Sequence, residues 1–141
     1  MTRLVWVVVV ATIGCASQRS TVAERVPLRE GEVRVIAGAA LDGGTRKGSF
    51  YEFQLPARSR SDHHRHPGPE FFYVVEGRAS VCYDDGRVDH IAAGDGRYIP
   101  ANVPHIDVNE EAVPVKVVVF LLLKPGEPPG FRAEETDQHA R

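Results

Sequence analysis

Short apolar runs, most of them alternating with polar residues, follow one another along residues 33–123 of the chain. Alternation with a period of two is typical of a β-strand with one buried face, and no segment shows the 3.6-residue period of a helix. Turns rich in Gly, Asp and Pro separate the runs, and residues 84–86 (Asp-Asp-Gly) predict a hairpin. The predicted strands are residues 33–37, 49–55, 63–66, 70–75, 78–83, 87–92, 98–99, 105–109 and 113–123. This pattern indicates an all-β domain, either a barrel or a jelly roll.

The N-terminal segment differs from the rest and resembles a targeting signal. Residues 4–13 are apolar and follow a short basic start, but the run is shorter than the ~20 residues that span a bilayer. It has the length of the hydrophobic region of a signal peptide. Residues 14–17, which include Cys15, resemble the lipobox of bacterial lipoproteins, in which the cysteine is lipidated and becomes the mature N-terminus. Thr12 departs from the aliphatic residue that is usual at its position.

This resemblance implies an exported protein, periplasmic or at the cell surface, that is held on a bacterial membrane only by a lipid on Cys15. Ordinary secretory cleavage near residues 16–17 and a buried N-terminal strand are alternatives that the residues leave open. Prolines beyond residue 124 end the predicted sheet, because proline has no N–H to donate. We therefore expect a signal peptide (1–15), a polar tether (16–31), one β-barrel domain (32–124) and a polar C-terminal tail (125–141).

Composition indicates a single domain and argues against nucleic acid as a partner. The chain has 141 residues and a net charge of −2, which gives room for one domain and no basic surface for nucleic acid. If Cys15 is removed or lipidated, Cys82 is the only free thiol and no intramolecular disulfide can form. Stability must then come from the core, with a bound metal and assembly into a homodimer as further contributions.

The most unusual segment is residues 63–70, which holds three of the six histidines and ends in a glutamate. Side chains alternate along a strand, so His64 and His66 share one face while His63 points the other way. Glu70 opens the next apolar run after a Pro-Gly-Pro corner. Two imidazoles on one face and a nearby carboxylate are ligand types that bind divalent transition metals.

A second segment, residues 94–109, brings another histidine after a proline-flanked turn. Together the two segments resemble the paired motifs of the cupin superfamily, over about residues 32–124. The residues on these motifs are His64, His66, Glu70 and Gly77 in the first, and Gly94, Pro100, His105 and Asn109 in the second. Arg58 and Asn102 stand where the motifs have glycine, and asparagine tolerates the left-handed conformation better than most residues.

The resemblance implies a single cupin-type jelly-roll β-barrel with one metal ion held by His64, His66, Glu70 and His105. Three nitrogens and one carboxylate suit Mn, Fe, Co, Ni, Cu or Zn, and ligand type alone does not choose among them. Such a set leaves one or two positions of an octahedral ion for a substrate, water or dioxygen.

Strand phase predicts further site residues. Counting by twos from His105 places Asp107 on the same face, where it is a candidate general base, although it would be merely solvated if the strand twists at the mouth. The same count from Glu70 places Phe72 and Val74 inside as walls of the pocket. Tyr98 is a weaker candidate for its rim.

The leading hypothesis is an exported cupin-type metalloenzyme, of the dioxygenase, isomerase or lyase type, acting on a small polar organic molecule. The alternatives are a protein that uses the metal to bind or sense a ligand without turnover, and one in which the metal only stiffens the barrel. One fold hosts many chemistries, so the sequence identifies neither the substrate nor the metal nor the reaction.

Overall fold

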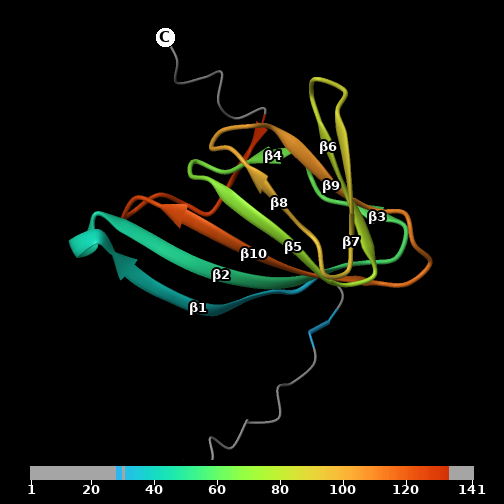
Figure 1. The fold of residues 1–141 in the computed structure, drawn as a ribbon, viewed down its shortest axis with the longest axis horizontal. Helices are drawn as coiled ribbons and strands as arrows, with labels where there is room; N and C mark the ends of the chain where they lie inside the picture. The colour runs from blue at the N-terminus through green and yellow to red at the C-terminus, as the bar shows by residue number, and fades with distance from the viewer. Residues whose placement is uncertain (1–27, 30, 134–141) are drawn as a thin grey trace, which may run out of the picture.

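The computed structural model of the protein describes residues 28–29 and 31–133 as two antiparallel β-sheets that face each other (Figure 1). One sheet has the order β1-β2-β10-β5-β8. Its strands are β1 (Val33–Leu41), β2 (Arg46–Leu55), β10 (Val115–Leu123), β5 (Glu70–Glu76) and β8 (Gly96–Ile99). A short 3-10 turn, Asp42–Gly44, joins β1 to β2. Figure 1 shows this hairpin extending past the edge of the second sheet.

The second sheet has the order β11-β4-β9-β6-β7, with β3 also paired to β9. Its strands are β3 (Ser59–Arg60), β4 (His64–Arg65), β6 (Arg78–Tyr83), β7 (Val88–Ala92), β9 (His105–Asn109) and β11 (Phe131–Arg132). All regular elements of the described residues other than the 3-10 turn are strands. The predicted all-β fold is therefore confirmed.

The core lies between the two sheets and follows the alternation seen in the sequence. In β10, every second side chain from Val115 to Leu123 is buried, although the strand reads as almost continuously apolar. In β9 the same alternation buries His105, Asp107 and Asn109 instead of apolar residues. The barrel therefore places a row of polar side chains from β9 inside a mainly apolar core.

Two short strands lie where the sequence indicated none. β3 falls within the predicted loop before the histidines, and β11 falls within the predicted C-terminal tail. Phe131 and Arg132 pair with Arg65 and His64, so the segment after the prolines returns to the edge of the histidine strand. Cys15 and the proposed signal peptide lie outside the described residues. Within the described part of the chain, no helix is long and apolar enough to span a bilayer.

The motif positions at which the family has glycine adopt backbone conformations that favour glycine. Gly77 and Gly94 have φ values of 87° and 91°. Arg58 and Asn102, which replace glycine in this chain, have φ values of 51° and 60°. Both turns therefore keep the left-handed conformation despite the substitutions, at a steric cost that asparagine bears more easily than arginine.

Asn109 ties three segments together at one end of the barrel. Its Nδ2 lies within hydrogen-bond distance of the backbone carbonyls of Leu55, Pro56 and Val113, at 3.1, 2.8 and 2.9 Å. Its Oδ1 accepts a hydrogen bond from the backbone N–H of Glu111 at 2.8 Å. The side chain is only 1% exposed, so water cannot replace these partners.

We expect Asn109→Ala to lower the free energy of unfolding by about 2 kcal/mol, because it leaves buried backbone groups without partners. Denaturant unfolding followed by circular dichroism measures the change. The adjacent, exposed Glu110 offers a matched control, and Glu110→Ala should leave the unfolding midpoint nearly unchanged. Equal midpoints for the two variants would show that Asn109 does not hold the segments together.

Candidate metal centre

The three histidines come from two neighbouring strands and the turn that follows one of them. His64 lies in β4, opposite His105 at the start of β9, and His66 follows β4 directly. The chain then turns through Gly68 to Glu70, the first residue of β5. A Cβ at Gly68 would lie 2.0 Å from the carbonyl oxygen of Leu122, so only glycine fits this turn against β10.

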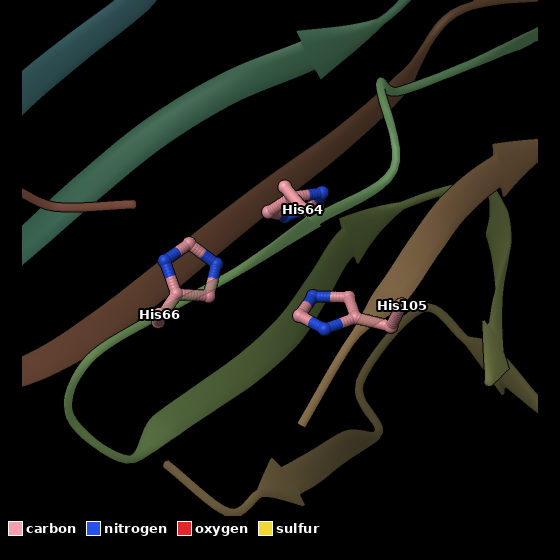
Figure 2. Close-up of side chains that lie close together, drawn as sticks. All are labelled: His64, His66 and His105. Carbon is pink, nitrogen blue, oxygen red and sulfur yellow. The ribbon is translucent and has the colours of Figure 1, made fainter. Parts of the chain in front are cut away.

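The three imidazole rings point toward one another inside the barrel (Figure 2). One nitrogen from each of His64, His66 and His105 can be chosen so that all three lie within 4.8 Å of one another. The ring centroids are 4.4 to 5.5 Å apart. The three histidines are thus placed to bind a metal ion.

Hydrogen bonds to the backbone fix which nitrogen of each ring faces inward. The Nδ1 of His64 lies 2.8 Å from the carbonyl oxygen of Asp62, and the Nδ1 of His105 lies 2.9 Å from that of Val103. The Nδ1 of His66 bonds the carbonyl oxygen of Pro129. Because a carbonyl only accepts, each Nδ1 carries a proton and each neutral ring presents the Nε2 lone pair to the interior.

Glu70 places a carboxylate beside two of these nitrogens. Its Oε2 lies 3.3 Å from Nε2 of His66 and 3.4 Å from Nε2 of His105, and the residue is 2% exposed. Among the described residues, Oε2 of Glu70 and Nε2 of His105 are buried without a hydrogen-bond partner. Buried polar atoms are costly unless paired, so a donor set that converges and lacks partners fits a bound cation.

Asp107 is a second buried carboxylate at the same point. Its Oδ2 lies 3.9 Å from Nε2 of His64, and its Oδ1 lies 4.0 Å from Nε2 of His105. Its backbone N–H donates to Oγ of Ser61 at 2.9 Å, which fixes its position on β9. The side chain is buried, so it does not face bulk water.

Burial and charge set the protonation of these groups. Burial raises the pKa of Asp107 to about 6, and the Glu70 carboxylate adds to the rise, while His105 and His64 oppose it. Burial also lowers the pKa of His64, which favours the neutral imidazole. For His105, burial lowers the pKa, but Glu70 and Asp107 raise it more, so the net shift is upward. The two carboxylates thus favour positive charge at this point. A bound metal cation would compensate their negative charge without protonation of His105 or Asp107.

The cavity next to the histidines has a volume of about 480 Å³. His64, His66, Glu70 and Asp107 are among its lining residues. The prediction that Phe72 and Val74 wall this cavity is wrong. Both face inward but are buried in the core, at 1% and 0% exposure, and neither is among the described lining residues. They lie on β5, which contributes Glu70 to the described lining, whereas the apolar lining comes mainly from β2 and β10.

Tyr98 does not lie at the rim of the cavity. Ile99, its neighbour on β8, is buried, so alternation turns Tyr98 to the outer face, where it is 56% exposed. There its ring centroid lies 5.2 Å from that of Phe71. The strand has only four residues, Gly96–Ile99, which is too short for the sequence alone to determine its phase.

The wall residues on β2 were not singled out from the sequence. Tyr51, Phe53 and Leu55 line the cavity at alternate positions, so the period of two in this strand was the available signal.

His63 points away from the centre, and its Nε2 lies 2.7 Å from Oδ1 of Asp84. His90 lies on β7, where its Nδ1 is 2.8 Å from Oγ of Ser80.

Two facing antiparallel sheets that enclose three converging histidines define a β-barrel protein with a candidate metal centre. Residues 51–121, half of the chain, match the Cupin domain family. The chain therefore belongs to this family.

The individual proteins that resemble this chain share a third or less of its residues in the matched regions. The chain is 33% identical over 73 residues to the uncharacterized protein MJ1618 of Methanocaldococcus jannaschii, a match that covers 51% of this chain and 58% of that protein. A cupin-like protein from Thermotoga maritima is similar in structure, with a TM-score of 0.58 at 18% identity over 71% of this chain and 73% of that chain. The DMSP lyase DddQ from Ruegeria pomeroyi has a TM-score of 0.53 at 20% identity over 60% of this chain and 42% of that chain. At these identities the two structures show the fold alone.

Proposed function

We propose that the protein is a metal-dependent enzyme that acts on a small organic molecule held in the cavity. His64, His66 and His105 would hold one divalent transition metal, with Glu70 as the fourth ligand. The observation that carries this proposal is the set of three Nδ1–carbonyl hydrogen bonds, which leaves three Nε2 atoms directed at one point. Such hydrogen bonds are the usual way in which proteins orient histidines that bind metals.

The donor set fits the group it would hold. Three neutral nitrogens and one carboxylate suit Mn, Fe, Co, Ni, Cu or Zn. When bound, such an ion supplies a Lewis acid that polarises an oxygen of the substrate. The protein supplies the remaining parts, which are a rigid ligand frame, an adjoining cavity and Asp107.

Asp107 favours reactions that begin with proton removal. Its carboxylate lies close to two of the nitrogens that would hold the metal, at 3.9 Å from Nε2 of His64 and 4.0 Å from Nε2 of His105. Its Oδ1 has no hydrogen-bond partner among the described residues, so it is free to accept a proton from a bound molecule. Isomerisation and elimination need such a base. A binding protein without turnover does not.

A combined assay of metal content, proton exchange and oxygen uptake tests the proposal. Mass spectrometry of the elements identifies the metal in the purified full-length protein. The loaded protein is then incubated in D₂O with a panel of carbonyl compounds, and an oxygen electrode is read in parallel. Metal-dependent deuterium incorporation without oxygen uptake is the expected result. Oxygen uptake would instead favour a dioxygenase, and tight binding with neither signal would favour a sensor.

We also propose that the protein is exported and lipid-anchored through Cys15, which rests on the lipobox-like sequence of residues 14–17. Cys15→Ser should remove the acylated residue and so release the protein from the membrane fraction or block its processing. Fractionation and intact-mass measurement in a bacterial host check this result, with Cys82→Ser as the control that should change neither. Wild-type protein that is soluble and retains Met1 would contradict the proposal.

A further inference from the structure

We propose that the molecule bound at this centre is amphipathic, with an oxygen-bearing head at the metal end and an apolar body, aromatic or branched aliphatic, against β2 and β10. This inference rests on the proposed function, since it gives a chemical class to the molecule that the metal centre would bind. It adds an apolar body to the small polar organic molecule expected from the sequence.

The apolar wall is a continuous surface built by strand register. β1, β2 and β10 are adjacent in the sheet, and Tyr51 of β2 pairs with Val35 on one side and Val119 on the other. Two positions further along β2, Phe53 pairs with Val33 and Val117 in the same way. Side chains two apart share a face, so these rows form one apolar surface on the inner side of the sheet. The apolar and aromatic side chains of β1, β2 and β10 in the cavity lining are Val33, Tyr51, Phe53, Leu55, Val119 and Leu121. The polar lining residues outside the metal centre are Gln54, Ser59, Arg60, Ser61 and Asp62.

This wall meets the metal centre directly. On β10, Leu121 pairs with Glu70 of β5, so a wall residue lies beside a proposed metal ligand. His64, His66 and Asp107 belong to the same cavity as the wall. A single bound molecule can therefore contact the carboxylates and imidazoles of the centre and the apolar side chains of β2 and β10 at the same time.

The opposite end of the wall is open to solvent. Val33 and Val35 lie on the inner side of the sheet by register, yet they are 63% and 61% exposed. Of these two, Val33 lines the cavity. An apolar body that reaches from the metal centre toward β1 would cover such surface, which is favourable in proportion to the area removed from water.

A wholly polar molecule fits this surface poorly. Phe53, Leu55, Val119 and Leu121 have no polar side-chain atom, and among the six wall residues only Tyr51 offers a hydroxyl. A polar group placed against them would lose its water without gaining a hydrogen bond. The volume of about 480 Å³ also lies within the range of roughly 300–1,000 Å³ typical of sites for drug-sized molecules.

Two probes with the same metal-binding head and different bodies test the inference. Acetohydroxamate and octanohydroxamate are titrated by calorimetry into the full-length protein, both metal-loaded and metal-stripped. We expect octanohydroxamate to bind at least about tenfold more tightly than acetohydroxamate in the loaded protein, because each buried methylene adds affinity. The same order should hold in the stripped protein, where both probes bind more weakly.

Matched variants test whether the apolar body of the probe contacts the wall. Tyr51→Ser should lower the affinity for octanohydroxamate about tenfold and leave that for acetohydroxamate within about twofold. Phe50→Ser is the control, since Phe50 directly precedes Tyr51 on β2 but is 43% exposed, with its ring centroid 4.8 Å from that of Phe120. Val33→Asp, at an exposed position, gives a second test that does not depend on the folding of the Tyr51 variant.

The outcomes separate this inference from the proposed function. The difference between loaded and stripped protein tests the metal centre, whereas the ratio of the two probes tests the amphipathic ligand. Equal affinities for the two probes would overturn the inference, as would a lack of octanohydroxamate binding to either form. It would also be overturned if the ratio were the same in Tyr51→Ser, Val33→Asp and Phe50→Ser.

Discussion

Replacing His105 with alanine should lower the affinity for a divalent transition metal by about a hundredfold or more. Even the loss of a group that only orients a metal ligand costs about ten- to hundredfold, and this substitution removes a ligand outright. His105 is fully buried, and its Nε2 lies 3.4 Å from Oε2 of Glu70, so the substitution removes a nitrogen directly beside the other proposed ligands. Metal content after dialysis against a competing chelator measures the effect.

His63 supplies a matched control for this experiment. It is adjacent in sequence to His64, but its Nε2 pairs with Asp84 at 2.7 Å on the outside of the barrel. His63→Ala should therefore keep its metal. The assignment of the centre would be wrong if His105→Ala retained metal as well as the wild type, or if His63→Ala lost it to the same extent.

Replacing Asp107 with asparagine should lower turnover by about a hundredfold or more while the protein keeps its metal. A positioned general base contributes about 10²- to 10⁴-fold, and the amide keeps the shape of the side chain but cannot accept the proton. Turnover is measured as the rate of metal-dependent deuterium exchange with whichever carbonyl compound the wild type accepts. Metal content is measured on the same samples.

Glu70→Gln separates coordination from catalysis. It removes an anionic ligand, so we expect it to weaken metal affinity itself, with turnover falling in proportion to the metal lost. Asp107→Asn should show the opposite pattern, full metal content with little turnover. If Asp107→Asn turned over at the wild-type rate, the base would have to be another group. If it lost metal as readily as Glu70→Gln, Asp107 would be a ligand.

The sequence predicted most of the strands and the residues that lie at the centre, but not the two-residue strands β3 and β11. Strand alternation is local, because successive side chains of an extended chain must point to opposite faces. For that reason His64 and His66, two residues apart, were placed together without knowledge of the fold, and so were His105 and Asp107. The same reasoning failed at Tyr98, where a four-residue strand between turns can adopt either phase.

The surroundings of the centre depended on contacts between distant parts of the chain. The carbonyls that orient His64 and His105 come from residues two positions earlier, so the local chain supplies them. The carbonyl that orients His66 belongs to Pro129, which is 63 residues away. It is brought there by β11, a strand of two residues with too short a pattern to recognise in the sequence.

Spacing along extended strands thus determined the all-β fold, the shared face of His64 and His66 and the shared face of His105 and Asp107. That His105 meets the other two histidines was implied by the resemblance to the cupin motifs. Only the tertiary structure decided which strands lie beside that centre. Pairing of β2 with β10 and of β10 with β5 brings Tyr51, Val119 and Leu121 into one wall next to Glu70. These pairings join segments far apart in the chain, and their register is set by packing of the whole barrel and not by any local pattern.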